Sequence, residues 1–124
     1  MNNQQGTESA EQMALFRWAT LQSGKHPELN AMYHIPNGGM RHKATAARLK
    51  AEGLKAGVPD ICLPVPMGKY AGLYVELKVG KNKPTKLQQE WLDTLASYGH
   101  KAVVCYGWED AMKVILDYIK GGRG

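Results

Sequence analysis

The sequence lacks the features that mark membrane-spanning, secreted and disulfide-stabilised proteins. It has two cysteines and one phenylalanine among 124 residues, and none of its apolar runs approaches the ~20 residues that a membrane-spanning helix requires. The polar N-terminal stretch MNNQQGTESAEQ has neither the basic nor the apolar segment of a signal peptide. We therefore expect a cytoplasmic protein without a membrane partner.

The spacings of common metal and nucleotide sites are also missing. Cys62 and Cys105 lie far apart within apolar runs, and the four histidines form no i,i+3 or i,i+4 pair. The glycine-rich segment NGGMRHKA matches neither the dinucleotide-binding pattern nor the Walker pattern. We expect both thiols to be buried and reduced, and we find little support for a zinc site or a nucleotide cofactor.

Positive charge is what the sequence has in excess. Its formal net charge is +5, and Lys and Arg collect in the segments 41–55 and 78–86, between segments richer in acids. A basic band of this kind indicates a polyanionic partner. With 44% hydrophobic and 22% charged residues the composition is that of a globular protein, and we expect a single domain that spans residues 1–124.

Hydrophobic periodicity and turn residues predict eight elements in the order α-β-α-β-β-α-β-α. The expected helices are 7–23, 43–54, 85–98 and 108–120, and the expected strands are 31–36, 60–65, 71–79 and 101–106. In the first helix the apolar residues at helical spacing are Ala10, Met13, Ala14, Trp18 and Leu21. In the last helix the inward residues are Ala111, Val114, Ile115, Tyr118 and Ile119. This order, with its central hairpin, favours an α/β sandwich whose mixed sheet is flanked by helices.

The two central strands carry charged residues near their ends, although both strands are otherwise apolar. In GVPDICLPVPMGKYAGLYVELK, Asp60 opens the first strand, and Glu76 and Lys78 close the second on one shared face. A loop centred on Gly68 places Asp60 opposite Glu76, and a loop centred on Lys69 places it opposite Lys78. A register shifted by one residue would separate the three side chains.

Two carboxylates that lie this close repel each other unless a cation sits between them. Mg²⁺ prefers a few carboxylate oxygens together with several waters. A lysine beside such a cation suits phosphodiester hydrolysis, because the metal lowers the pKa of a bound water and the lysine positions the nucleophile or the scissile phosphate. The alternative is that each charge is an ordinary strand end in water, since exposed ion pairs contribute little to stability.

Several other residues have structural interpretations. Thr85 and Gln88 form the pattern of a capping box. His34 is expected to be a strand histidine with satisfied hydrogen bonds, although it could touch a substrate. The three tryptophans are expected in the core rather than as base-stacking platforms, and they are Trp18, Trp91 and Trp108.

A longer pattern runs through the segments EQMALFRWA, IPNGGMRHKATAARLKAEGLKAGVPDICLPVP, GLYVELK, TKLQQEW and GWEDAMKVILDYI. With its P-D…E-x-K order, the chain resembles the PD-(D/E)xK nuclease superfamily and, within it, the stand-alone VRR-NUC domains of bacteriophages. The resemblance implies a restriction-endonuclease-like fold and a homodimer that cuts branched DNA in a bacterial or phage-infected cell. It further implies an endodeoxyribonuclease that depends on Mg²⁺ or Mn²⁺ and acts as a Holliday-junction resolvase.

The resemblance also assigns roles to individual residues. It implies that Asp60, Glu76 and the backbone carbonyl of Leu77 bind the metal, and that Lys78 positions the attacking water. The family places a glutamine near the active site at the position of Gln88.

A glutamate on the first helix completes the family's site. Glu8 lies four residues before Gln12, as in the family's E-x-x-x-Q pattern, and is the first choice as catalytic and metal-binding residue. Glu11 lies one turn away, and both stay open.

The candidate DNA-contacting residues are Asn37, Gly38, Gly39, Arg41, His42, Arg48, Lys50, Lys55, Lys81, Lys83 and Lys86. Of these, Lys81, Lys83 and Lys86 flank the proposed metal, where a phosphate backbone would run. Asn37, Gly38 and Gly39 are turn residues, and their backbone N–H groups are expected to approach phosphate. For Arg48, Lys50 and Lys55 the alternative is the solvated face of a helix.

Other functions remain open at this point. A catalytically silent DNA-binding or assembly module, and a flap or nicking nuclease of the same fold, are the main alternatives. A basic structural protein would explain the net charge but not the three charged residues of the hairpin.

Overall fold

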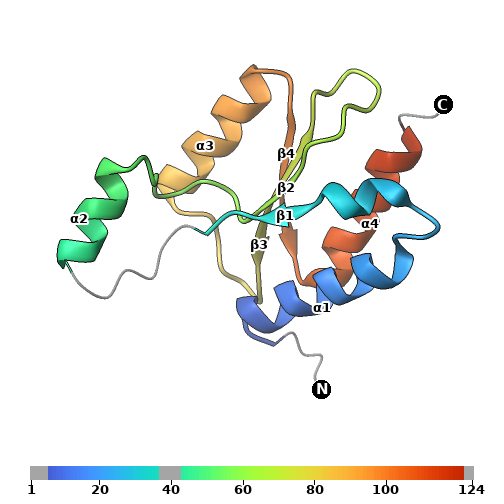
Figure 1. Cartoon of the computed structure of the whole chain (residues 1–124), viewed down its shortest axis with the longest axis horizontal. Coiled ribbons are helices and arrows are strands. Elements are labelled where there is room, and N and C mark those ends of the chain that lie inside the picture. The colour runs from blue at the N-terminus through green and yellow to red at the C-terminus, as the bar shows by residue number, and fades with distance from the viewer. Residues whose placement is uncertain (1–5, 37–42, 122–124) are drawn as a thin grey trace.

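A mixed four-stranded sheet lies at the centre of the molecule, with helices on both faces (Figure 1). The computed structural model describes residues 6–36 and 43–121. The elements are α1 (Glu8–Gln22), the 3-10 helix η1 (Pro27–Ala31), β1 (Tyr33–His34), α2 (Lys43–Ala51), β2 (Ile61–Leu63), β3 (Leu73–Lys78), α3 (Lys86–Ser97), β4 (Lys101–Tyr106) and α4 (Trp108–Gly121). The α/β sandwich that the sequence predicted is therefore confirmed.

The strands lie in the order β1-β2-β3-β4, where β2 is antiparallel to both neighbours and β3 is parallel to β4. Ile61 pairs with Val75, so Asp60, which directly precedes β2, lies opposite Glu76. This is the register predicted for a loop centred on Gly68.

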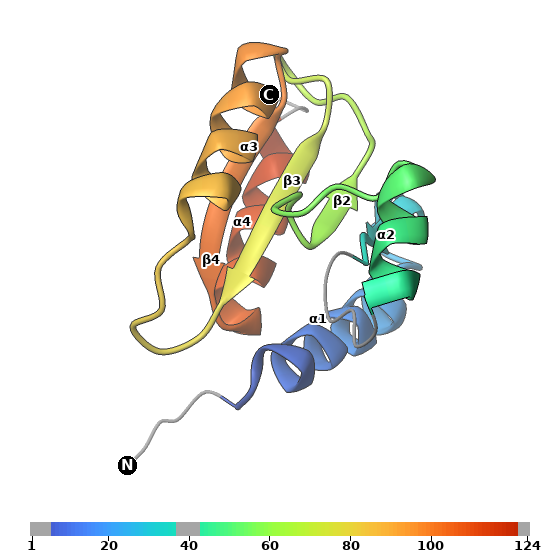
Figure 2. The ribbon, with the colours of Figure 1, turned by 90° about the vertical axis from the view of Figure 1, so that its left-hand side faces the viewer.

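The main core lies on one face of the sheet. Alternate strand residues pack there against α1 and α4, and they are Ile61, Leu63, Leu73, Val75 and Leu77. α4 buries Ala111, Ile115, Tyr118 and Ile119, as its amphipathic pattern predicted. α3 packs against β4 on the other side of the sheet, as Figure 2 shows, and buries Leu92 and Leu95.

The inward face of α1 differs from the prediction. Leu15 and Ala19 are buried, whereas Met13 is 59% exposed and Leu21 is 75% exposed. Apolar residues occupy several faces of this helix, so helical spacing alone defines no single buried stripe. Thr7, the first residue of the expected helix, caps α1, because its side chain accepts a hydrogen bond from the Ala10 N–H.

Several predicted elements are shorter in the structure. The strand expected at 31–36 is reduced to Tyr33–His34: Ala31 belongs to η1, Met32 caps that helix, and Ile35 and Pro36 follow the strand. β2 ends before Pro64, whose nitrogen carries no hydrogen for the sheet. α2 ends at Ala51, and Gly53 follows with a positive φ of 109°. Cys62 and Cys105 are buried free thiols, as predicted.

α2 stands apart from the sheet (Figures 1 and 2). The structure describes its side chains from residue 45 onward, and none of these is buried. Within residues 6–36 and 43–121, no helix combines the length and the apolar character needed to cross a membrane.

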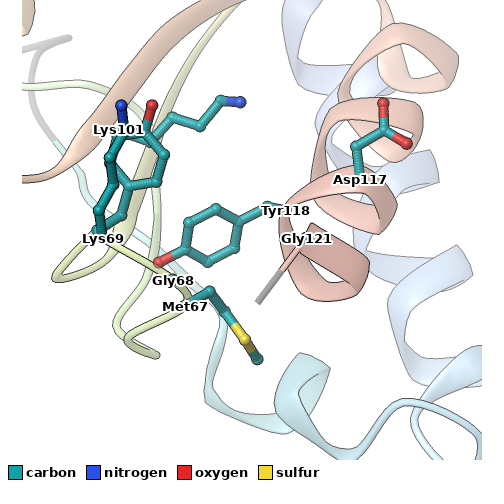
Figure 3. A pocket seen from close by; sticks show the side chains of 8 residues that line it. Met67, Gly68, Lys69, Lys101, Asp117, Tyr118 and Gly121 are labelled. Carbon is teal, nitrogen blue, oxygen red and sulfur yellow. The ribbon is translucent and has the colours of Figure 1, made fainter. Parts of the chain in front are cut away.

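The turn of the β2–β3 hairpin is anchored to α4. The Tyr118 hydroxyl donates to the Val65 carbonyl at 2.6 Å, and the backbones of Met67 and Tyr70 bond to each other. Figure 3 shows the Tyr118 ring reaching from α4 toward the turn. The cavity beside it, of about 240 Å³, is lined in part by Lys69 and Lys101.

Candidate active site

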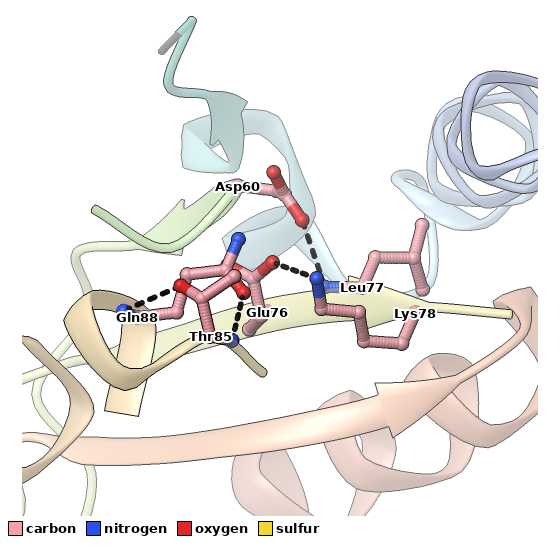
Figure 4. Close-up of polar contacts among 6 residues, drawn as sticks. All are labelled: Asp60, Glu76, Leu77, Lys78, Thr85 and Gln88. Atoms are coloured by element: carbon pink, nitrogen blue, oxygen red, sulfur yellow. Dashed lines mark hydrogen bonds and ion pairs between the residues drawn. The ribbon is translucent and has the colours of Figure 1, made fainter. Parts of the chain in front are cut away.

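The candidate site lies at the other, open end of the hairpin. Because β2 begins one residue after Asp60, it pairs with β3 only as far as Val75. The Asp60 side chain then takes the place of a strand partner, since its Oδ2 accepts a hydrogen bond from the Leu77 N–H at 2.8 Å (Figure 4). The structure thereby brings Asp60 and Glu76 to the same end of the hairpin.

Glu76 is the most deeply buried charged residue of the site. It is 1% exposed, and its Oε2 lies 3.6 Å from the Lys78 Nζ. Its buried Oε1 has no hydrogen-bond partner among the residues that the structure describes. Burial, followed by the charges of Asp60 and Glu8, raises the pKa of Glu76 to about 8, although Lys78 opposes this. A carboxylate in this position needs more positive charge than Lys78 alone provides.

A cavity of about 220 Å³ adjoins these residues. It is lined by Glu8, Ser9 and Gln12 from α1, His34 from β1, and Asp60 and Leu77 from the hairpin. Glu8 and Gln12 are four residues apart, so they share the helix face that turns toward the hairpin. The cavity therefore joins a helix carboxylate to the charged end of the hairpin, as the prediction for Glu8 required.

The two candidate glutamates of α1 have different surroundings. Glu11 accepts hydrogen bonds from the Gly6 N–H at 2.9 Å and from the Trp108 N–H at 2.8 Å, one to each carboxylate oxygen. It thereby caps the start of α4, where a negative charge is favourable. Glu8 lines the cavity with Asp60 instead. The geometry favours Glu8 as the carboxylate available to a ligand.

Gln88 forms the capping box that the sequence predicted. The side-chain Oε1 of Gln88 accepts a hydrogen bond from the Thr85 backbone N–H at 2.9 Å, and the Gln88 backbone N–H donates to the Thr85 Oγ1 at 3.1 Å. The side-chain oxygen of Gln88 is thus used at the start of α3 (Figure 4). A role for Gln88 in the active site stays a prediction.

His34 has a place in the site that sequence reasoning left open. Its Nδ1 lies 2.8 Å from the Asp60 carbonyl oxygen, so the expectation of a hydrogen-bonded strand histidine is confirmed. The ring also lines the cavity beside Asp60. Only the pairing of β1 with β2 brings these two residues together, and no spacing in the sequence signals it.

The basic residues of the predicted DNA surface are exposed wherever the structure describes them. They are Arg48, Lys50, Lys55, Lys81, Lys83 and Lys86. Lys81 and Lys83 lie on the connection that leads from Lys78 to α3. The other five predicted contacts lie outside the described residues, namely Asn37, Gly38, Gly39, Arg41 and His42.

The tryptophans are divided between the core and the surface. Trp18 and Trp108 are partly buried and pack against the main core, as predicted. Trp91 is half-buried and lines a shallow surface cavity with Leu87, outside that core.

In the described part of the chain, no three carboxylate, imidazole or thiol side chains lie close enough together to enclose a metal ion as they stand. Asp60 is engaged with the Leu77 N–H, and Glu76 faces Lys78. The buried and unpartnered Oε1 of Glu76 nevertheless fits a hard cation, because such an oxygen otherwise carries a desolvation cost without compensation.

Comparison with known proteins finds similarity to one family of domains. A profile of the VRR-NUC domain matches residues 7–109 of this chain. A solved structure described as a VRR_NUC domain protein is 34% identical in sequence, with a TM-score of 0.82, and the match covers 95% of this chain and 92% of that one. No protein with a curated description matches the sequence.

Proposed function

The chain belongs to the VRR-NUC family of nuclease domains, and on that premise we propose that it is a metal-dependent endonuclease of branched DNA that resolves four-way junctions. The observation that carries this proposal is the open end of the hairpin. There Asp60 lies opposite Glu76, and Lys78 lies beside Glu76. One buried carboxylate oxygen of Glu76 has no partner within residues 6–36 and 43–121.

Asp60, Glu76, the Leu77 carbonyl and Glu8 are the groups that would hold Mg²⁺ or Mn²⁺. When bound, the cation supplies Lewis-acid stabilisation of charge on the phosphate and lowers the pKa of a water. Glu76 needs this charge most, because burial and neighbouring carboxylates disfavour its ionised form. Glu11 has no part in this proposal, since both of its oxygens accept backbone hydrogen bonds.

Lys78 supplies a fixed cation from the protein itself. Its side chain is only 9% exposed and its Nζ lies 3.6 Å from Glu76, so the ammonium group is held toward the carboxylates rather than toward bulk water. From that position it orients the attacking water or the scissile phosphate, and it offsets the charge that develops in the transition state.

The exposed basic residues supply affinity for DNA. The exposed side chains that can contact phosphates are Arg48, Lys50, Lys55, Lys81, Lys83 and Lys86. The proposal adds five residues outside the described part of the chain, namely Asn37, Gly38, Gly39, Arg41 and His42. Phosphate contacts release counterions, so DNA affinity should fall steeply as salt is raised. A flat salt response would contradict this assignment.

A two-fold dimer completes the proposal, because it places two sites to cut opposite strands of a symmetric junction. Analytical ultracentrifugation at the concentrations used for cleavage tests this. If the protein is a monomer and cuts only one strand, it is a nicking or flap nuclease and not a resolvase.

The decisive experiment compares labelled four-way junctions, flaps and linear duplex in the presence of Mg²⁺ or Mn²⁺. We expect paired cuts in the junction, and we expect Asp60→Ala to abolish them while junction binding is retained. Absence of cleavage of every substrate by correctly folded protein would overturn the proposed activity and leave a DNA-binding module.

A further inference from the structure

One ring nitrogen of His34 is fixed by the backbone. Its Nδ1 lies 2.8 Å from the carbonyl oxygen of Asp60, which also accepts the Ile35 N–H at 2.7 Å. A carbonyl oxygen can only accept hydrogen bonds, so the hydrogen must be on Nδ1. The neutral imidazole therefore carries its lone pair on Nε2.

The same ring lines the cavity of the candidate site. Glu8, Asp60 and Leu77 line that cavity too, and all three belong to the proposed set of metal-binding groups. The ring is exposed rather than packed in the core, so no burial by apolar neighbours explains its position.

An imidazole that donates one N–H to a backbone carbonyl and presents its other nitrogen is the usual arrangement of a metal-binding histidine. The Oε1 of Glu76 is an independent observation at the same end of the hairpin. It is buried without a partner among the described residues, and a positive charge nearby would stabilise it. We propose that His34 is a further ligand of the divalent cation, through Nε2, and that it biases the site toward Mn²⁺ over Mg²⁺. This inference rests on the proposed function of the same site.

The bias follows from the chemistry of the ligands. Mg²⁺ is bound by oxygen atoms, whereas imidazole nitrogen is a ligand of transition metals. Asp60, Glu76, Glu8 and the Leu77 carbonyl supply only oxygen. A nitrogen from His34 therefore strengthens Mn²⁺ binding and contributes little to Mg²⁺ binding.

Two substitutions separate a ligand from a merely positioning residue. His34→Asn keeps an N–H near the position of Nδ1, so the hydrogen bond to the Asp60 carbonyl is preserved, but it has no atom at the position of Nε2. His34→Ala removes both. Thermal unfolding of each variant establishes that the chain folds.

The measurements are titration calorimetry with Mn²⁺ and with Mg²⁺, and pulsed EPR of bound Mn²⁺, which detects a directly coordinated nitrogen. We expect the nitrogen coupling in the wild-type protein and its loss in both variants. The Kd for Mn²⁺ should rise about tenfold in both variants, while the Kd for Mg²⁺ changes by less than about threefold.

The outcomes are distinguishable. If His34→Asn keeps the nitrogen coupling, or restores the Mn²⁺ affinity that His34→Ala loses, His34 only positions Asp60 and the inference is wrong, while the proposed metal site stands. If the wild-type protein binds neither ion, the proposed function fails and the inference fails with it.

Discussion

The two ends of the β2–β3 hairpin differ in the burial and the hydrogen bonding of their polar groups. At the turn, the Tyr118 hydroxyl donates to the Val65 carbonyl. The lysines of the adjacent cavity are Lys69, which is exposed, and Lys101. At the open end, Glu76 and Lys78 are buried, and one carboxylate oxygen of Glu76 has no partner in the described part of the chain.

The turn end of the hairpin therefore stabilises the folded chain, and the open end destabilises it. Satisfied hydrogen bonds and packed rings at the turn lower the free energy of the folded chain. An unpartnered buried oxygen at the open end raises it. Departures of this kind from local consistency are expected at functional sites. Matched substitutions at the two ends therefore test whether only the open end serves catalysis.

The largest effect is expected from the lysines. Lys78→Met should lower the cleavage rate by at least about a thousandfold, because it removes the fixed cation that faces the carboxylates. Lys101→Met, at the turn end, should leave the rate within about twofold. Single-turnover cleavage of a labelled junction measures both. Equal losses of cleavage rate in the two variants would mean that Lys78 has no specific role in catalysis.

The next effect separates the glutamates of α1. Glu8→Gln should lower cleavage about a hundredfold with little change in stability, because it weakens the proposed metal site. Glu11→Gln should lower the free energy of unfolding by about 1–2 kcal/mol, since one of its backbone hydrogen bonds is lost. Urea unfolding and Mn²⁺ titration of both variants provide the test, and the reversed pattern would assign the site to Glu11.

A third effect concerns pH. Folded Glu76 has a pKa of about 8 against an ordinary value of 4.5, so its protonation stabilises the fold fully below pH 4.5. That contribution is lost as pH rises through about 8, because the unfolded chain has already released the proton. In EDTA, Tm should therefore fall over this range, and Glu76→Gln should exceed the wild type by more than about 5 °C at pH 8. A Tm difference that does not vary with pH would contradict this.

The smallest effect is expected at the turn. Tyr118→Phe removes only the hydroxyl that donates to Val65, and should lower the free energy of unfolding by about 1 kcal/mol with cleavage unchanged. Urea denaturation with a parallel cleavage assay provides the measurement. A large loss of activity would mean that the two ends of the hairpin are coupled.

The sequence predicted the parts of the fold in which local signals agree. α3 begins at its capping box, and β4 and α4 lie where alternating and amphipathic patterns placed them. These signals lie within a few residues of each other along the chain, so no tertiary information was needed. The sequence left two hairpin registers open, and the structure has the one centred on Gly68.

The missed features depend on contacts between distant segments. The inward face of α1 is chosen by α4 and the sheet, because apolar residues occur around the helix. The first predicted strand loses its first residue, Ala31, to η1, although Pro27 suits the first residue of a helix. His34 enters the site only through strand pairing, and the separation of Glu8 from Glu11 depends on Trp108, far along the chain.

The bond from Trp108 to Glu11 has a consequence for the order of events during synthesis. Residue 11 is made early and its partner 97 positions later, so α1 cannot acquire its final anchorage until most of the polypeptide has left the ribosome. Glu8 lies one turn from that anchor. Until Trp108 has been made, a nascent chain lacks the contact that anchors α1, and with it Glu8, beside the hairpin.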